Sequence, residues 1–417
     1  MEKKIKLSIC IPTYNRAAFL RFLLTTFVEQ KVIDFPYEIV ISDNASTDDT
    51  TSVVEDFVQL GLPIRYFKRE VNGGGWPNLA NAYQQAIGEY ALYLADDDLL
   101  NFENLRAAIT YLNINAETVA CYAPWTLYDA IDEVDGSLFY AVEKKRTFSR
   151  RSFNDVFDFM TTRHIFPEIA IYRTSALRSA FVPKDFCFWA FAHLAHLLDV
   201  GAVTFLEKPF YRSVVRAAVE RDRGQAGIDE VMTGWDRYRG GLEYFLYFGS
   251  KRGQIDLSPA KSGHYEEACK AFTLTRMSVA LRMWVARGEY IKAYEIFTRM
   301  CYGGYSHHPE VQAIRDRLPL MVAVQTLAQK VNASSSSLKY LILDQVTSVD
   351  SLASLLLEVG LNDDIAILPT PTEHTQEITS AAAVFTANPS GRKVFLEKGY
   401  HPNMVFCESD IVSPVVT

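Results

Sequence analysis

The sequence predicts an α/β fold with a mostly parallel sheet at the N-terminus, then a helical region and a small second α/β unit. Strand-like apolar runs alternate with helix-period segments over the first hundred residues. Helical periodicity dominates from about residue 228 to 330, and four short apolar runs follow a serine-rich linker at 332–337. With 417 residues, 49% of them apolar, the chain can fill several cores. We expect domains at 1–215, 216–333 and 334–417.

The first hundred residues predict a sheet with a ligand-binding edge. We expect strands at 7–11, 37–42, 64–67 and 90–95. They are separated by a helix at 16–30, a helix that follows capping residues 46–49 and runs through residue 60, and a helix at 78–87. Strands in this alternation run parallel and are joined by right-handed crossovers, with helices on both faces. Ligands of such sheets bind where the strands end. The segments that we expect at this edge are 12–16, 43–46, 69–76 and 96–98.

Beyond residue 105 the pattern becomes mixed. Apolar runs at 119–128 and 137–142 flank Asp135-Gly136, which predicts a hairpin turn. We expect helices at 152–161 and 186–198, and strands at 169–173 and 203–206. The helical region contains a helix pair at 265–286 and 290–300. In the last unit we expect strands at 340–343, 365–368, 383–386 and 404–407, with helical stretches at 352–359 and 392–398.

Composition narrows the functional class. The 42 basic and 50 acidic residues give a net charge of −8, which argues against nucleic-acid binding because phosphate contact needs a concentrated basic surface. Six widely spaced cysteines without a CxxC pair fit a reducing compartment. No apolar run approaches the roughly 18 residues of a membrane span, and the N-terminus is typical of a strand rather than a signal peptide. We expect a cytoplasmic chain; peripheral contact with the inner face of the plasma membrane and homo-oligomer formation stay open.

Three adjacent carboxylates, Asp96, Asp97 and Asp98, follow the fourth predicted strand. Such neighbours repel one another unless a cation neutralises them. Oxygen ligands suit Mg²⁺ or Mn²⁺, and Mg²⁺ commonly combines one or two carboxylates with phosphate oxygens. The pattern therefore predicts a metal–diphosphate site. The alternative is a solvated acidic loop that caps the following helix.

Other residues at this edge have the chemistry to bind a nucleotide. Tyr14 can stack on a base, Asp43 can accept from a base N–H, and Arg69 can meet a phosphate. The glycines at 73–75 let backbone approach a ligand closely. Alternatively, Asp43 only shapes a turn and the glycines form a flexible loop.

Four segments in this order, IPTYNR, EIVISDNASTDDT, VNGGG and GEYALYLADDD, resemble the family 2 inverting glycosyltransferases. The chain is most similar to the O-antigen and capsule sugar transferases of the abequosyltransferase-like group, over roughly residues 5–215. The resemblance implies a GT-A fold, which is Rossmann-like, and a nucleotide-sugar donor. By similarity, Asp43 binds the base, Asp96 the ribose, and Asp97 the metal, with Asp98 as an alternative metal ligand. The full set of residues expected at the donor is Pro12, Thr13, Tyr14, Arg16, Asp43, Arg69, Asp96 and Arg212.

The catalytic base is the point at which the chain departs from the family. Relatives open a later helix with a Glu-Asp pair, and the matching residues here, 188–191, contain no acid. An inverting transfer needs a group that takes the proton of the attacking hydroxyl. The candidates are His193, Asp185, His196, Glu168 and His164. We favour His193 over Asp185, although either helical histidine could simply pack between helices.

These observations predict a metal-dependent inverting glycosyltransferase that uses a nucleotide-diphosphate sugar. The acceptor is expected to be a hydroxyl of a glycan or lipid-linked glycan in bacterial surface polysaccharide synthesis. One alternative is a degenerate, non-catalytic scaffold, which the missing Glu-Asp pair favours and the three aspartates oppose. A nucleotidyltransferase fits less well, because the segment at 12–16 is not a glycine-rich basic loop. For Arg212, which follows Tyr211, the alternative to a diphosphate contact is an ordinary surface position.

Overall fold

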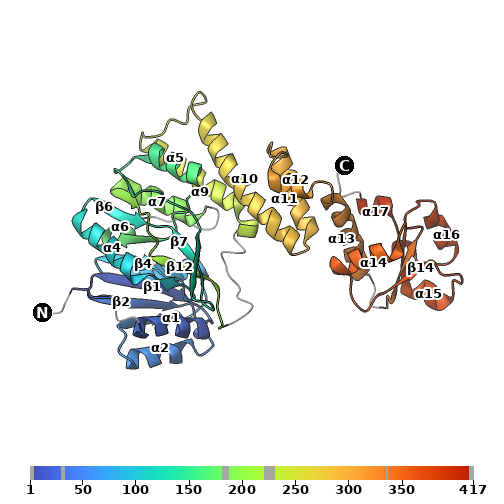
Figure 1. The fold of residues 1–417 in the computed structure, drawn as a ribbon, viewed down its shortest axis with the longest axis horizontal. Coiled ribbons are helices and arrows are strands. Elements are labelled where there is room, and N and C mark those ends of the chain that lie inside the picture. The colour runs from blue at the N-terminus through green and yellow to red at the C-terminus, as the bar shows by residue number, and fades with distance from the viewer. Residues whose placement is uncertain (1–3, 30–32, 181–186, 220–230, 335–336, 413–417) are drawn as a thin grey trace. The chain divides into compact units, whose positions relative to one another are not determined.

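The computed structural model describes residues 4–29, 33–180, 187–219, 231–334 and 337–412 (Figure 1). The chain divides into two compact units, which consist of residues 1–225 with 236–272, and of residues 226–235 with 273–417. The expected three domains stay a prediction, and the first unit extends beyond the boundary expected at residue 215. It does so because residues 236–272 contribute aromatic side chains to its core, as when Phe153 meets Phe245 with ring centroids 5.4 Å apart.

The larger sheet of the first unit has eight strands among the described residues, in the order β3-β2-β1-β4-β10-β6-β11-β9. Strands β1 to β4 are mutually parallel, as the sequence predicts, whereas β10 runs antiparallel between β4 and β6. The bounds are β1 Leu7–Thr13, β2 Tyr37–Asp43, β3 Ile64–Lys68, β4 Tyr90–Tyr93, β6 Thr118–Tyr122, β9 Arg146–Phe148, β10 Ala170–Arg173 and β11 Ala202–Phe205. We call the side at which β1 to β4 end the carboxyl edge; it comprises residues 13–16, 43–46, 69–75 and 94–98.

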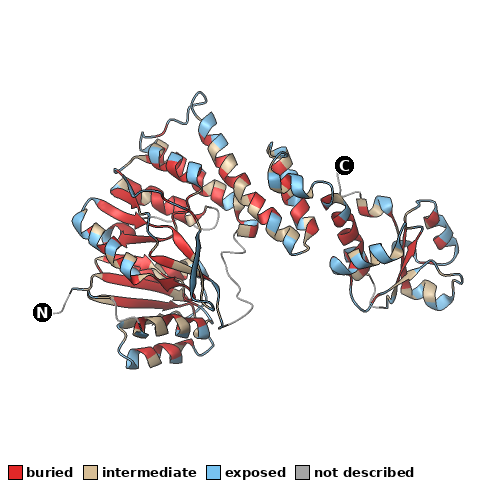
Figure 2. Cartoon of the chain, in the orientation of Figure 1, coloured by how far each residue is buried: buried red, intermediate tan, exposed pale blue. Residues whose placement is uncertain are grey.

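Helices α1 (Ala17–Glu29), α2 (Thr50–Gln59) and α3 (Gly75–Gln85) connect these parallel strands. Helices α1 and α2 pack side by side (Figure 1). Apolar residues at helical spacing form the buried face of α1, as predicted: Phe19, Leu20, Leu23, Leu24 and Phe27. Each such side chain contributes about 1.5–3 kcal/mol on burial. Figure 2 shows the resulting buried sheet between partly exposed helices.

Helix α2 begins at Thr50, directly after residues 46–49, which the sequence predicts as capping residues. Asp48 fixes this start, because its Oδ1 accepts hydrogen bonds from the amide (3.1 Å) and the hydroxyl (2.6 Å) of Thr50. Its Oδ2 accepts from the amide of Ala17, so this side chain fixes the starts of two helices. Residues 46–49 therefore lie between β2 and α2, outside the helix.

A second sheet of the first unit has the order β5-β12-β7-β8, with β5 Leu99–Leu100, β7 Trp125–Asp129, β8 Val134–Leu138 and β12 Tyr211–Arg216. The predicted hairpin exists, but its turn is not at Asp135-Gly136, which lies inside β8. The turn lies earlier in the sequence, between Asp129 and Val134, because Asp129 Oδ1 accepts hydrogen bonds from the amides of Ile131 and Asp132. Gly136 is needed for close strand approach, since a Cβ there would lie 2.8 Å from the Leu127 carbonyl oxygen.

The remaining helices of the first unit cover its sheets. They are α4 (Phe102–Ile114), α5 (Phe153–Arg163), α6 (Thr174–Ser179), α7 (Trp189–Val200) and α9 (Trp235–Lys251), and α10 (Gly263–Ala286) continues into the second unit. Helix α7 is apolar around most of its circumference, which suits its deeply buried position.

The second unit combines helices with a small parallel sheet. Helices α11 (Tyr290–Tyr302), α12 (Pro309–Ile314) and α13 (Leu318–Asn332) precede a sheet of order β14-β13-β15-β16. Its strands are β13 Tyr340–Asp344, β14 Ala366–Pro369, β15 Ala382–Thr386 and β16 Val405–Cys407, and its helices are α14 Val349–Glu358, α15 Gln376–Ala381, α16 Gly391–Glu397 and α17 Glu408–Val412. The four strands predicted here are all present. Within the described parts of the chain, none of the helices has the length and apolarity to traverse a bilayer.

Candidate functional site

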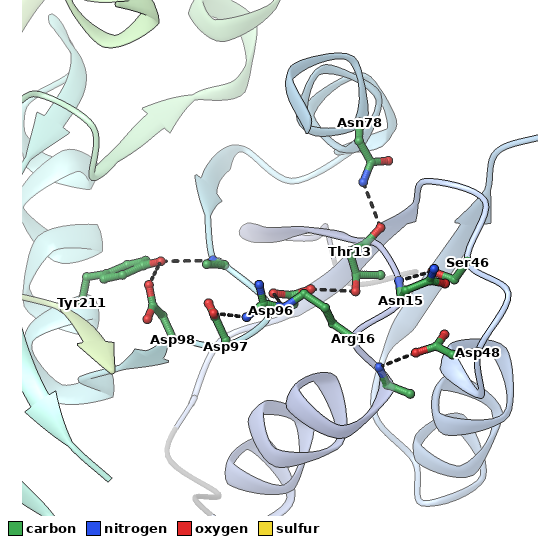
Figure 3. A network of polar contacts seen from close by, with 12 residues as sticks. Thr13, Asn15, Arg16, Ser46, Asp48, Asn78, Asp96, Asp97, Asp98 and Tyr211 are labelled. Atoms are coloured by element: carbon green, nitrogen blue, oxygen red, sulfur yellow. Dashed lines mark hydrogen bonds and ion pairs between the residues drawn. The ribbon is translucent and has the colours of Figure 1, made fainter. Parts of the chain in front are cut away.

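The three aspartates lie at the carboxyl edge, beside the segment that follows β1 (Figure 3). Strand β4 ends at Tyr93, and Leu94-Ala95 carries the chain to them. Asp96, Asp97 and Asp98 are only 6–8% exposed. A solvated acidic loop, the alternative expected from the sequence, is therefore wrong, and the buried charges require partners.

Arg16 is the cation that faces two of these carboxylates. Its Nε lies 3.2 Å from Asp96 Oδ1, and its Nη2 pairs with Asp97 Oδ2. Thr13 Oγ1 donates to the other oxygen of Asp96 at 2.7 Å. Burial raises the pKa of Asp96 to about 7, while the Arg16 guanidinium opposes this rise. A positive charge thus compensates an otherwise unfavourable pair of buried acids.

Asp98 has different partners, which come from β12. Its Oδ2 accepts from Tyr211 Oη and its Oδ1 from the Val214 amide, both at 2.8 Å. Tyr211 Oη also accepts from the Ala95 amide at 3.1 Å (Figure 3). Both oxygens of Asp98 are therefore used to fasten β12 to the carboxyl edge. Its expected metal role stays a prediction, and this geometry gives it no support.

Asp43 is fully buried at the end of β2. Its Oδ1 accepts from the Ser46 amide at 2.8 Å and its Oδ2 from Tyr66 Oη at 2.5 Å. Burial, and after it the hydrogen bond to Asp43, raises the pKa of Tyr66. Asp43 thus shapes its own loop, as one reading of the sequence predicts, and each oxygen retains a second lone pair for a ligand.

The loops after β1 and β2 interlock. Asn15 and Ala45 both have left-handed backbone, with φ of +50° and +68°. The Asn15 amide donates to Ser46 Oγ at 2.8 Å (Figure 3). Asn15 Oδ1 accepts from the Thr47 amide at 2.7 Å. Left-handed backbone is unfavourable for alanine, so surrounding contacts must hold this conformation.

Asn44 organises the glycine loop, a function that sequence reasoning missed. Its Oδ1 accepts from Arg69 Nη1 (2.9 Å) and from the Gly73 amide (3.0 Å). Its Nδ2 donates to Asn72 Oδ1 (2.7 Å) and to the Gly74 carbonyl (3.2 Å). The loop is therefore anchored to the end of β2 rather than unsupported. The only sequence signal was the position of Asn44 directly after a strand of the expected edge.

Tyr14 and Arg212, which are both expected to bind the donor, lie in different surroundings. Tyr14 is 42% exposed, so its ring is open to stacking. Arg212 instead pairs with both oxygens of Asp135 at 2.6–2.7 Å and lies over the Tyr128 ring. Its diphosphate contact stays a prediction, because in this structure its charge is directed to the β7–β8 hairpin.

The candidate bases occupy unlike environments. His193 is 1% exposed, burial lowers its pKa to about 3, and its Nδ1 has no hydrogen-bond partner among the described residues. His196 Nε2 is bonded to Tyr244 Oη at 2.7 Å. His164 ends α5 in left-handed backbone, and Asp185 lies outside the described residues. The role favoured for His193 stays a prediction, and its burial does not support it.

The residues present fit a hard divalent cation only together with a substrate. No cluster of three or more His, Cys, Asp or Glu side chains with metal-binding geometry occurs in the described ranges. Asp96 and Asp97 nevertheless direct oxygens toward one common cation, the Arg16 guanidinium. One or two carboxylates completed by diphosphate oxygens are a usual Mg²⁺ ligand set.

Comparison with known proteins gives one family match and several partial relatives. Residues 8–181 match the family model described as "Glycosyl transferase family 2". Abequosyltransferase RfbV of Salmonella typhimurium is 35% identical over 127 residues, which cover 30% of this chain and 38% of that protein. Poly(ribitol-phosphate) beta-N-acetylglucosaminyltransferase TarS of Staphylococcus aureus is 34% identical over 113 residues, 26% of this chain and 19% of that protein. This chain thus matches well under half the length of either relative.

Among solved structures, S. aureus TarS 1-349 in complex with UDP-GlcNAc aligns with a TM-score of 0.46 and 18% identity. The alignment covers 77% of this chain and 85% of that chain.

Proposed function

We propose that this chain, whose residues 8–181 form a glycosyl transferase family 2 domain, transfers a sugar from a nucleotide-diphosphate donor to a hydroxyl group. The acceptor is a glycan or a lipid-linked glycan of a bacterial surface polysaccharide, and the anomeric configuration inverts. The observation that carries this proposal is the pair of buried carboxylates, Asp96 and Asp97, balanced by Arg16 at the carboxyl edge of that domain.

The donor would bind along the carboxyl edge. Tyr14 stacks on the nucleobase, with Pro12 and Thr13 behind it, and the free lone pairs of Asp43 accept from a base N–H. Asp96 accepts from the ribose. Arg16 and Arg69 lie where they can meet the diphosphate, and the anchored glycine loop lets backbone approach it. Arg212 would have to exchange Asp135 for a phosphate oxygen.

The leaving diphosphate must be stabilised as the bond to the sugar breaks. A divalent cation such as Mg²⁺ or Mn²⁺, held by Asp97, would supply Lewis-acid stabilisation there. Arg16 neutralises the same carboxylates in this structure, so its guanidinium is available for the diphosphate when a metal takes over that task. Positive charge already oriented at the carboxyl edge needs little reorganisation during the reaction.

The two partial relatives support this class of function but not a particular substrate. By their names, one transfers abequose and the other transfers N-acetylglucosamine to poly(ribitol-phosphate). Their matches to this chain cover no more than 38% of either protein. The two names are consistent with relatives that share a donor-binding segment but use different sugars and acceptors.

The test is donor hydrolysis across a panel of nucleotide sugars with Mn²⁺, read as released nucleoside diphosphate. We expect release with at least one donor and its loss in Asp97→Asn. Asp49→Asn is the matched control, because Asp49 is an exposed acid near the carboxyl edge whose side chain makes no cap hydrogen bond. No release from any donor, together with no nucleotide binding by calorimetry, would overturn the proposal and favour a non-catalytic scaffold.

A further inference from the structure

The antiparallel strand β10 brings an additional acid to the carboxyl edge. Its register with β4 pairs Ile171 with Leu92 and Tyr172 with Ala91. Continued toward the start of β10, this register sets Glu168 level with Ala95, the residue before Asp96. Because β10 runs opposite to its neighbours, its amino end lies where theirs finish. Glu168 therefore stands beside the three aspartates, although 70 residues separate it from Asp98.

Charge effects on one phenol agree with this placement. Tyr93, the last residue of β4, has a pKa that burial raises well above its ordinary value. The charges of Asp98, Asp97, Asp96 and Glu168 raise it further, so all four carboxylates lie near enough to Tyr93 to act on its hydroxyl. Burial, and after it the charge of Glu168, also raises the pKa values of two other tyrosines, Tyr140 and Tyr172. Glu168 itself is half-buried, which leaves it reachable by a substrate.

An aromatic pair marks the neighbouring surface of the same edge. Trp76 lies in the first turn of α3 and Trp189 begins α7, and their ring centroids are 5.4 Å apart. Both rings are half-buried. Trp189 also packs near His193, whose ring lies 5.1 Å from that of Tyr172. A chain of contacts thus connects this apolar platform, of the type that lines ligand pockets, to strand β10, which begins two residues after Glu168.

We propose that Glu168 is the catalytic base, which takes the proton of the acceptor hydroxyl. This inference rests on the proposed function. The acceptor O–H bond breaks and its proton moves to the Glu168 carboxylate, while the oxygen forms a bond to the anomeric carbon. The bond between that carbon and the diphosphate breaks, and the nucleoside diphosphate leaves with the electron pair. Protonated Glu168 returns its proton to solvent after the products depart.

The test separates proton removal from donor binding. In Glu168→Gln we expect transfer to an acceptor to fall by about 100-fold or more, the usual range for a lost general base. The dissociation constant for the nucleoside diphosphate with Mn²⁺ should stay within about twofold, because the donor contacts come from other strands. Glu117→Gln is the matched control, since Glu117 is exposed and precedes β6 at the opposite edge of the sheet.

Rescue by azide distinguishes a catalytic base from a residue that only supports the structure. Azide attacks the anomeric carbon without a proton to remove, so it releases nucleoside diphosphate and forms a glycosyl azide of inverted configuration. We expect azide to restore donor turnover in Glu168→Ala, which leaves room for it, but not in Asp97→Asn. Unchanged transfer in Glu168→Gln, or loss of donor binding with no azide rescue in Glu168→Ala, would overturn the inference. A wild-type chain that binds and hydrolyses no donor would instead overturn the proposed function.

Discussion

In each unit, aspartates lie at or just after the ends of parallel strands, but the partners of these aspartates differ in charge. In the second unit, Asp344 ends β13 and accepts from the hydroxyls of Thr370 (2.7 Å) and Thr386 (2.8 Å). In the first unit, Asp96 and Asp97 meet a guanidinium. Neutral donors satisfy a buried carboxylate locally, whereas adjacent acids that need a cation concentrate charge that a ligand can use. The same sheet geometry thus yields a structural aspartate in one unit and a candidate site in the other.

The largest expected effect is on Asp97. Asp97→Asn should lower nucleoside diphosphate release by about 100-fold or more, because several kcal/mol of stabilisation at the leaving group would be lost. Nucleotide release with saturating Mn²⁺ and donor measures it. A rate within threefold of wild type would mean that the aspartates paired with Arg16 have no more functional importance than Asp344, which is bonded to neutral hydroxyls.

Asp344 should show the opposite behaviour. Asp344→Ala should leave nucleotide release unchanged but destabilise the second unit by about 1–3 kcal/mol, since the buried hydroxyl of Thr386 loses its acceptor. Urea unfolding followed by hydrogen exchange of residues 340–386 measures this change. Asp363→Ala, at an exposed position in the same unit, should have little effect. Loss of nucleotide release in Asp344→Ala would contradict the contrast drawn between the units.

A third prediction concerns Asn44, whose neutral side chain holds the glycine loop in the first unit. Asn44→Ala removes the acceptor shared by Arg69 and the Gly73 amide. We expect the dissociation constant for nucleoside diphosphate to rise about fivefold to tenfold, equivalent to about 1 kcal/mol, with a smaller change in turnover. Isothermal titration calorimetry checks this. Asn72→Ala, which removes one hydrogen bond of the same loop, should weaken binding less.

The smallest expected effect concerns pH and His193. Burial lowers the pKa of His193 from 6.5 to about 3. Below pH 6.5 the imidazole is therefore protonated in the unfolded chain, whereas in the folded chain it stays neutral down to about pH 3. Stability therefore falls as pH drops through this window, by about 1 kcal/mol between pH 7 and 5.5. His193→Phe should show a shallower dependence of Tm on pH over that range. An identical dependence in both proteins would show that the pKa of His193 is the same in the folded and the unfolded chain.

Local sequence patterns were sufficient to predict β1 to β4, α1 to α3, and the convergence of Thr13, Asp43 and Asp96 on one edge. They were not sufficient where a residue's partners come from a distant segment of the chain. The partners of Asp98 are Tyr211 and the Val214 amide, more than a hundred residues away. The position of Glu168 depends on the antiparallel direction of β10, which periodicity does not encode. The hairpin turn was misplaced because the Asp129 side chain competes with a favourable Asp-Gly pair.

The link from Asp98 to β12 has a practical consequence for dividing this protein. The family match ends at residue 181, and a fragment cut there would retain every motif of the carboxyl edge. It would lack Tyr211 and Val214, so the buried carboxylate of Asp98 would lose both donors and the turn that carries its two neighbours would lose its support. A fragment meant to keep the carboxyl edge intact must therefore extend at least through Arg216, well past the end of the family match.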